Sequence, residues 1–191
     1  MTPPPRPLRL DHLAFHTRNA RATAEFWTQT MRCRLVAALA SRSMVVSRLE
    51  YPYLHVFVEL ADGSHIAFFE VPDARPEARR APPFDMTNHI AFHLDTVADV
   101  HAWKAWLMGK GVEVVGPADH GILLSIYFDD PTSNCRLEFT TSLARLSDAD
   151  AADAATALDR WDALRDEAAR RRIPFSALLR ERLPQHSRIA G

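Results

Sequence analysis

Histidines are the residues of this chain with the clearest potential for chemistry. The 191-residue sequence contains nine histidines and only two cysteines. His12 opens the segment His-Leu-Ala-Phe-His, and His89, 77 residues later, opens the nearly identical His-Ile-Ala-Phe-His. Neutral imidazole is the commonest metal ligand among side chains. A pair of histidines related by an internal repeat therefore predicts one metal site built by two copies of a module.

The segments that follow the two histidines also share the same order of predicted helix and strands. Apolar periodicity predicts a helix over residues 22–31 in the first copy and 97–108 in the second. The repeat offset carries Phe26 onto Trp103 within these helices. Alternating patterns predict three more strands in each copy, at 34–39, 54–60 and 65–71 and at 112–115, 123–128 and 135–140. The order β-α-β-β-β, twice, predicts an α+β fold of two βαβββ modules.

Composition shifts divide the chain into four parts. We expect a first module over 8–72, a proline-rich linker over 73–87, a second module over 88–142 and a helical tail over 143–191. In the tail, one helix should run from Ser147 or Asp148 to about Arg172. A second should begin near Pro174, because proline suits the first helical turn. We expect the tail to serve packing or dimerisation.

Alternation along the strands predicts which side chains share a face, because successive strand residues point to opposite sides. If Leu137 and Phe139 are buried, Glu138 faces the opposite side. The same parity places Glu70 on the helix side or at a strand end. It also leaves Ala67 where the second copy has Glu138.

One polar face collects six histidines by this parity: His12, His16, His55, His65, His89 and His93. A solvated sheet face would explain any one of them, but six on one parity favour a site. His12 and His16 cannot share an ion, because four strand residues span ~13 Å. The repeat-related pair is the better choice, so the predicted metal ligands are His12, His89 and Glu138.

At this point the sequence resembles the vicinal oxygen chelate superfamily, which includes glyoxalase I, extradiol dioxygenases, fosfomycin-resistance enzymes and bleomycin-binding proteins. The resemblance covers roughly residues 8–142. It implies that two βαβββ modules form a cupped mixed sheet around a divalent metal held by His12, His89 and Glu138. Ala67 stands where glyoxalase I has a fourth protein ligand, which counts against glyoxalase chemistry. Two nitrogens and one carboxylate instead leave positions open for substrate and dioxygen.

A second motif resembles the extradiol dioxygenase signature, in which a His and a Tyr precede the ligand Glu. The matching residues here are His120, Tyr127 and Glu138. Ala118 and Ser133 depart from that signature, and one extra residue separates Ser133 from the glutamate. Because a Tyr before the last strand is common throughout the superfamily, His120 is the discriminating residue.

The resemblance implies a ring-cleaving dioxygenase that uses Fe(II), or else Mn, Ni or Zn, with O2 and a catechol-like small molecule. His120 would act as general acid or base, since an imidazole pKa of ~6.5 suits proton transfer near neutral pH. Tyr127 would hydrogen-bond the substrate. Weaker candidates for the substrate pocket are His55, His65, Phe57 and Phe69.

Two other functions stay open on the sequence. One is a glyoxalase-like lyase, isomerase or thiol transferase that uses the ion as a Lewis acid, and the other is a ligand-binding or resistance protein. A formal net charge of −1 gives no reason to expect nucleic acid or an anionic membrane as partner. With no signal-like segment and two unpaired cysteines, we expect a cytoplasmic protein with reduced thiols, assembled as a homodimer.

Overall fold

The computed structural model of the chain describes residues 9–43, 52–72, 87–145 and 147–183. Two compact units divide the chain. The first comprises Met1–Ala91, Ala105–Val114 and Tyr127–Glu138, and the second comprises Phe92–Lys104, Val115–Ile126 and Phe139–Gly191. The four predicted domain boundaries remain predictions, and linker residues 73–86 lie outside the described part.

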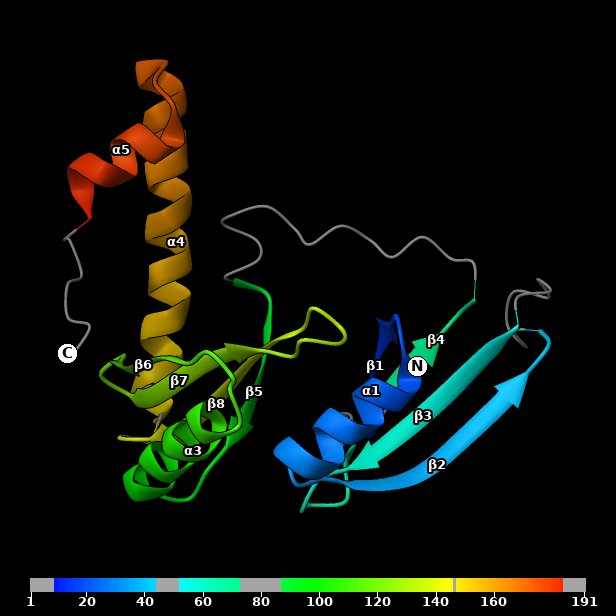
Figure 1. Cartoon of the computed structure of the whole chain (residues 1–191). Coiled ribbons are helices and arrows are strands. Elements are labelled where there is room, and N and C mark those ends of the chain that lie inside the picture. Colours follow the sequence, from blue (N-terminus) through cyan, green and yellow to red (C-terminus); the bar gives the residue numbers. More distant parts are fainter. Residues whose placement is uncertain (1–8, 44–51, 73–86, 146, 184–191) are drawn as a thin grey trace, which may run out of the picture. The chain divides into compact units, whose positions relative to one another are not determined.

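The first βαβββ module forms one four-stranded mixed sheet in the order β1-β4-β3-β2 (Figure 1). β1 runs parallel to β4, while β3 is antiparallel to both β4 and β2. Its elements are β1 (His12–Thr17), α1 (Ala20–Glu25), the π-helical turn η1 (Phe26–Thr30), β2 (Arg34–Ser41), β3 (Tyr53–Glu59) and β4 (His65–Glu70).

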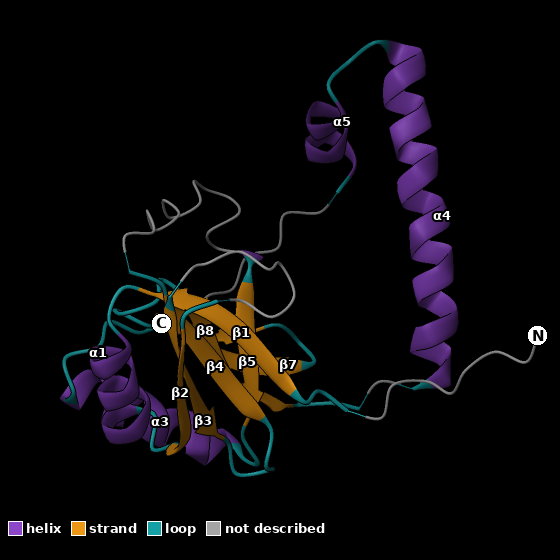
Figure 2. Ribbon diagram, turned by 90° about the vertical axis from the view of Figure 1, so that its right-hand side faces the viewer, coloured by secondary structure: helices purple, strands orange, loops and turns teal. Residues whose placement is uncertain are grey.

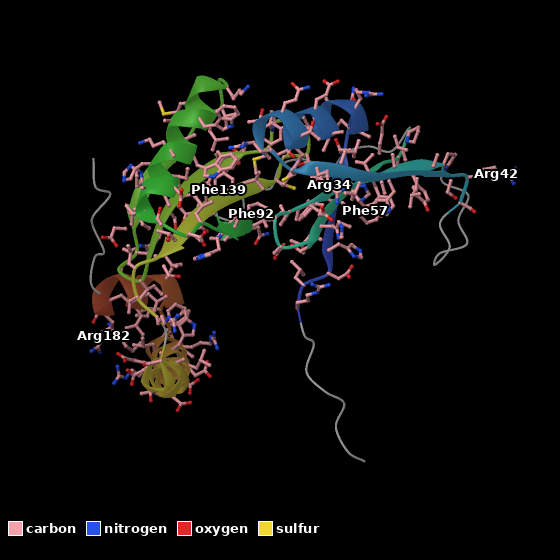
Figure 3. The ribbon with its side chains drawn as sticks, turned by 90° about the horizontal axis from the view of Figure 1, so that it is seen from below. Arg34, Arg42, Phe57, Phe92, Phe139 and Arg182 are labelled. Atoms are coloured by element: carbon pink, nitrogen blue, oxygen red, sulfur yellow. The ribbon has the colours of Figure 1, made fainter. Side chains whose placement is uncertain are left out.

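Alternation along β3 and β4 builds the core of this module. Val56 and Val58 on β3 and Phe68 on β4 are buried, and Trp27 packs on Phe68 with 5.4 Å between ring centroids. Phe57, between the two valines, projects from the face of the sheet opposite α1 (Figure 3). The predicted division into a helix-covered face and a polar face is therefore confirmed for this sheet.

The helix of the first module begins two residues earlier than predicted, at Ala20. The Asn19 side chain accepts a hydrogen bond from the Ala22 backbone N–H at 2.9 Å, and Glu70 Oε2 accepts one from the Ala20 N–H at 2.6 Å. These carboxylate and amide oxygens satisfy N–H groups that a helix start leaves without partners. Parity correctly placed Glu70 on the helix side of its strand.

The second module repeats this order in a sheet of order β5-β8-β7-β6. Its elements are β5 (His89–His93), α3 (Val97–Gly109), β6 (Val115–Asp119), β7 (Leu123–Asp129) and β8 (Arg136–Ser142). Phe92 and Phe139 contact each other at 6.0 Å between ring centroids, and Trp103 of α3 packs on Phe139 at 4.6 Å (Figure 3). The two repeated modules predicted from the sequence are therefore confirmed.

One strand prediction was wrong. The segment 112–115 was expected to be a strand, but the strand begins at Val115 and runs to Asp119. Val112 instead closes the end of α3, where its N–H donates to the Leu107 carbonyl at 3.0 Å and the preceding Gly111 has φ +79°. This is a glycine-based helix C-cap. Gly116 and Pro117 hid the true strand, because both residues usually interrupt strands.

The tail forms the two predicted helices, α4 (Asp148–Arg171) and α5 (Phe175–Arg182). Figure 2 shows α4 as one uninterrupted helix followed by the short α5. Ala168 and Leu178 are buried, and Trp161 meets Phe175 edge-on at 5.1 Å. Among the described residues, no helix is long and apolar enough to cross a membrane.

Candidate metal centre

His89 and Glu138 form the nucleus of the candidate site. His89 starts β5 and Glu138 lies on the adjacent strand β8, and His89 Nε2 is 2.7 Å from Glu138 Oε2. The Glu138 side chain is only 5% exposed, whereas that of His89 is 31% exposed. A carboxylate buried to this degree needs a cationic or hydrogen-bonding partner. The imidazole supplies one here, and a metal cation would supply a stronger one.

The second nitrogen of His89 is also engaged. Nδ1 lies 3.0 Å from the Thr87 carbonyl oxygen, which can only accept a hydrogen bond. Nδ1 therefore carries a proton and donates it to the Thr87 carbonyl. In the tautomer whose single proton is on Nδ1, Nε2 turns a lone pair toward Glu138. This is the tautomer that a metal ligand requires.

Tyr127 and Arg136 complete the surroundings of the carboxylate. The Tyr127 hydroxyl donates to Glu138 Oε1 at 3.1 Å, and its ring meets His89 edge-on at 5.9 Å. The Arg136 guanidinium carbon lies 5.2 Å from the centre of the Tyr127 ring, and the side chain is 15% exposed. Arg136 Nε is buried without a hydrogen-bond partner. One donor on a largely buried cation is thus left unused.

His12, like His89, has an oxygen atom within hydrogen-bonding distance of its Nδ1. Its Nδ1 lies 2.7 Å from Asp11 Oδ1, and this hydrogen bond holds the pKa of the Asp11 carboxyl below its ordinary value. A carboxylate on Nδ1 fixes the ring so that Nε2 carries the free lone pair, as in many metal-binding histidines. Asp11 and His12 correspond to Asn88 and His89 in the repeat.

His12 is not part of the pair formed by His89 and Glu138. Within residues 9–43, 52–72, 87–145 and 147–183, no group of three or more His, Cys, Asp or Glu side chains is close enough to hold one ion. The folded chain therefore brings together two of the three predicted ligands, and His12 stands separately at the start of β1.

The weaker pocket candidates lie together on the polar face of the first sheet. The His55 ring stacks on Phe69 with 3.6 Å between centroids and 16° between planes, and it lies 4.2 Å from Phe57. Tyr53 meets Phe69 edge-on at 5.2 Å. Burial, and then the nearby charge of His12, lower the pKa of His55. A neutral His55 behaves as one more flat ring in this row.

This aromatic row reaches toward His12. Phe57 lies 6.0 Å from the His12 ring and 6.4 Å from the His65 ring, in both cases edge-on. Ala67, the predicted gap, is fully buried next to Phe57 and faces Ala14 of β1 in the strand register. Two alanines are thus paired between β1 and β4 in this part of the sheet.

His120 lies in the turn between β6 and β7, where its N–H donates to the Leu123 carbonyl at 2.9 Å. It belongs to the second compact unit, whereas Tyr127 and Glu138 belong to the first. Its assignment as acid or base remains a prediction.

The two cysteines offer neither ligands nor nucleophiles in this state. Burial raises the pKa of the Cys33 thiol to about 11, and burial likewise raises that of Cys135 to about 11. Only thiolates bind metals or attack substrates strongly. The donors in this chain are therefore the histidines and carboxylates.

Asp11 and Arg136 are the residues that sequence reasoning passed over. Arg136 stands two positions before Glu138, so the alternation that predicts Glu138 on the polar face predicts Arg136 there too. Asp11 directly precedes His12. An acidic residue next to a candidate ligand was a signal for the hydrogen bond now observed.

Comparison with known proteins agrees with this architecture. The family model of the Glyoxalase/Bleomycin resistance protein/Dioxygenase superfamily matches residues 9–139. Because this span is most of the chain, the chain belongs to that superfamily, the vicinal oxygen chelate group that the sequence resembles. No curated protein sequence matches significantly.

Among solved structures, a glyoxylase/bleomycin resistance protein/dioxygenase domain from Frankia sp. EAN1pec is similar at a TM-score of 0.58 and 14% identity, covering 72% of this chain and 99% of the other. The fosfomycin resistance protein FosX from Listeria monocytogenes is similar at 0.51 and 20% identity, covering 72% and 95%. TnmS3, an antibiotic binding protein from Streptomyces sp. CB03234, is similar at 0.50 and 17%, covering 71% and 96%. At these identities the similarity establishes the fold.

Proposed function

We propose that the chain is a divalent-metal-dependent enzyme that acts on a small molecule presenting two adjacent oxygens. The finer form of the proposal is a ring-cleaving dioxygenase of a catechol-like substrate with Fe(II) and O2. The observation that supports it most directly is that the two repeat-related histidines, His12 and His89, make the same kind of hydrogen bond. Each has Nδ1 on an oxygen acceptor, and one presents Nε2 to a buried carboxylate.

The donor set fits a divalent ion. Two imidazole nitrogens and one carboxylate suit iron, manganese, nickel or zinc and leave positions for substrate. The buried Glu138 carboxylate offers the negative charge, and His89 and His12 offer nitrogens whose tautomers are fixed. A bound ion would supply positive charge that holds both substrate oxygens and lowers their pKa.

The chain's own residues have separate tasks in this proposal. The Tyr127 hydroxyl, now donating to Glu138, can turn its hydrogen bond to a substrate oxygen. The Nε donor of Arg136, which is buried without a hydrogen-bond partner, can bind an anionic oxygen of the substrate. The rings of His55, Phe57 and Phe69 offer apolar aromatic surface that a substrate ring can contact. His120 remains the proposed acid or base.

Metal titration of matched histidine variants tests the site itself. His89→Ala and Glu138→Gln should lose most affinity for Mn(II) or Fe(II) in calorimetry, by about 10-fold to 100-fold or more. His93→Ala, which removes an exposed histidine from the same strand, should bind like the unmodified chain. Equal affinity in His89→Ala and His93→Ala would end the proposal.

Mixing two inactive variants tests where the third ligand comes from. His12→Ala and Glu138→Gln each remove one proposed ligand. If one site draws His12 from one copy and the His89–Glu138 pair from another, an equimolar mixture regains about a quarter of the metal binding, because half of the pairs are mixed and each mixed pair holds one intact site. If a single copy builds the site, the mixture regains none.

Oxygen uptake tests whether the chain is a ring-cleaving dioxygenase. After anaerobic loading with Fe(II), the protein should consume O2 with at least one member of a panel of monocyclic and bicyclic catechols and give a coloured ring-fission product. His120→Ala should keep metal affinity but lose turnover. Metal binding without uptake across the panel would reject the dioxygenase and leave the metal site intact.

A Lewis-acid enzyme that uses no oxygen is the second candidate, and Arg136 favours it. A largely buried guanidinium with an unused donor suits a substrate that carries a permanent anionic group. FosX, which shares the fold, has been crystallised with Mn(II) and sulfate. For this candidate, phosphonates or sulfate should protect the chain against thermal unfolding in the presence of Mn(II). Loss of that protection in Arg136→Gln would support this candidate over the first.

A further inference from the structure

Among the described residues, few side chains of other elements pack on the first half of α4. Every described side chain from Asp153 to Ala163 is exposed, including Leu158 at 68% and Trp161 at 39%. The short α5 covers only the later part of the helix, where Ala168 and Leu178 are buried. Helices of ordinary length gain most of their stability from packing one face. A 24-residue helix, about 36 Å long, is therefore left with about three turns uncovered.

The charges of α4 are separated along its length. From 148 to 159 its only charged residues are aspartates, whereas residues 160–172 contain five arginines and three acidic residues. Some of the second-half charges are paired locally, as in Arg165–Asp162 and Arg171–Glu167. Asp153, Asp159, Arg160 and Arg170 form no ion pair among the described residues. The helix thus carries unpaired negative charge in its first half and unpaired positive charge in its second.

We infer that α4 is a self-association surface whose partner is α4 of a second copy of this chain in antiparallel orientation. Antiparallel pairing places the acidic half of each helix against the arginine-rich half of the other, and it also aligns the helix dipoles favourably. Leu158 and Trp161 flank the middle of the helix. In a two-fold arrangement each copy therefore brings these apolar side chains to the same central contact. A parallel pair would place like charges together.

The inference does not depend on the metal site, and charge reversal tests it. The first variant, Asp153→Arg with Asp159→Arg, removes the net negative charge of residues 148–159. The second, Arg160→Glu with Arg170→Glu, makes residues 160–172 net negative. Each should weaken self-association of the full chain at least tenfold in sedimentation equilibrium. An equimolar mixture of the two should regain it.

Recovery of self-association in the mixture is the decisive result, because only pairing between two α4 helices predicts it. A matched control, Asp95→Arg with Glu113→Arg, changes the net charge by as much as the first variant, at exposed positions outside the tail. It should leave the association constant unchanged. Leu158→Ala should weaken association about tenfold, while Met108→Ala, at another exposed apolar residue, on α3, should not. Wild-type chain that sediments at 21.5 kDa up to 100 µM overturns the inference. So does unchanged association in both charge variants, or failure of the mixture to regain it.

Discussion

Asp130 shows how one buried carboxylate organises its surroundings. It is 1% exposed and sits in the turn between β7 and β8. Oδ2 accepts hydrogen bonds from Trp27 Nε1 at 2.9 Å and the Ser133 hydroxyl at 2.6 Å, and Oδ1 accepts two from Thr132 at 2.7 Å. The turn that separates Tyr127 from Glu138 is thereby tied to the buried indole of the first module.

Replacing Asp130 should be costly. Asp130→Ala leaves the buried Trp27 N–H and the part-buried Thr132 and Ser133 donors without their acceptor, so we expect the free energy of unfolding to fall by about 3–5 kcal/mol. Trp27→Phe removes one donor and keeps a ring, and should cost about 1–3 kcal/mol. Urea denaturation measures both. Asp62→Ala is the control, because this exposed turn aspartate bonds similarly to Ser64 and should cost under about 1 kcal/mol. Equal losses at Asp62 and Asp130 would contradict this account.

His55 should make the fold sensitive to acid. Its Nε2 is buried without a hydrogen-bond partner, and burial lowers its pKa. As pH falls below the ordinary imidazole pKa of ~6.5, the unfolded chain takes up a proton that the folded chain resists. The stabilisation is therefore present above that pH and lost on acidification. His55→Phe should keep the stability of the unmodified chain at pH 7.5 and lose less of it at pH 5. Identical pH dependence in thermal melts would refute the argument.

For single residues, alternation along a strand predicted the face on which a side chain lies better than it predicted what the side chain does. It separated Glu138 from Glu70 correctly, because a strand admits only two side-chain directions. It could not show that Asp130 is an acceptor for Trp27, since that contact joins residues 103 positions apart.

At the scale of elements, the end of α3 and the start of β6 explain the one misplaced strand. The apolar run after Gly111 looked like a strand, yet Val112 caps the helix. The actual strand contains Gly116 at φ +105°, where a Cβ atom would lie 2.8 Å from the Ser125 carbonyl oxygen. Close backbone approach between β6 and β7, rather than side-chain pattern, determines this pairing. Sequence periodicity carries no information about such contacts.

Gly116→Ala should therefore weaken the second sheet. The Cβ clash with Ser125 and the positive φ together predict a loss of about 2–4 kcal/mol in unfolding free energy. Gly109→Ala is the matched control, because a Cβ there meets nothing within 4 Å and the residue ends α3 with ordinary φ. It should be neutral or stabilising by up to about 1 kcal/mol. Denaturant curves of the two variants should differ clearly, and coincident curves would show that β6 can move away from Ser125.

At the scale of the whole molecule, the repeat made the fold predictable and left the site incomplete. A 77-residue offset and two alternating patterns were enough for two βαβββ modules, since each module's core is local. A meeting of His12 with the His89–Glu138 pair would depend on how modules or copies associate, and local patterns do not encode that. In the tail, likewise, the two helices were predictable from local patterns, whereas local patterns do not predict what packs on them.

Metal binding should stabilise the whole fold, because an ion that binds only the folded state shifts the unfolding equilibrium by mass action. At a free ion concentration 100 times the dissociation constant, the gain is about 2.7 kcal/mol, or a rise of about 5–10 °C in melting temperature for a chain of this size. Mn(II) should produce that rise, and EDTA should reverse it. His93→Ala should respond in full. His89→Ala should not respond, because it loses the nitrogen that lies 2.7 Å from Glu138. The response of His12→Ala then measures how far the separate histidine of β1 contributes: a response like that of His93→Ala would remove His12 from the ligand set while leaving the His89–Glu138 pair in place.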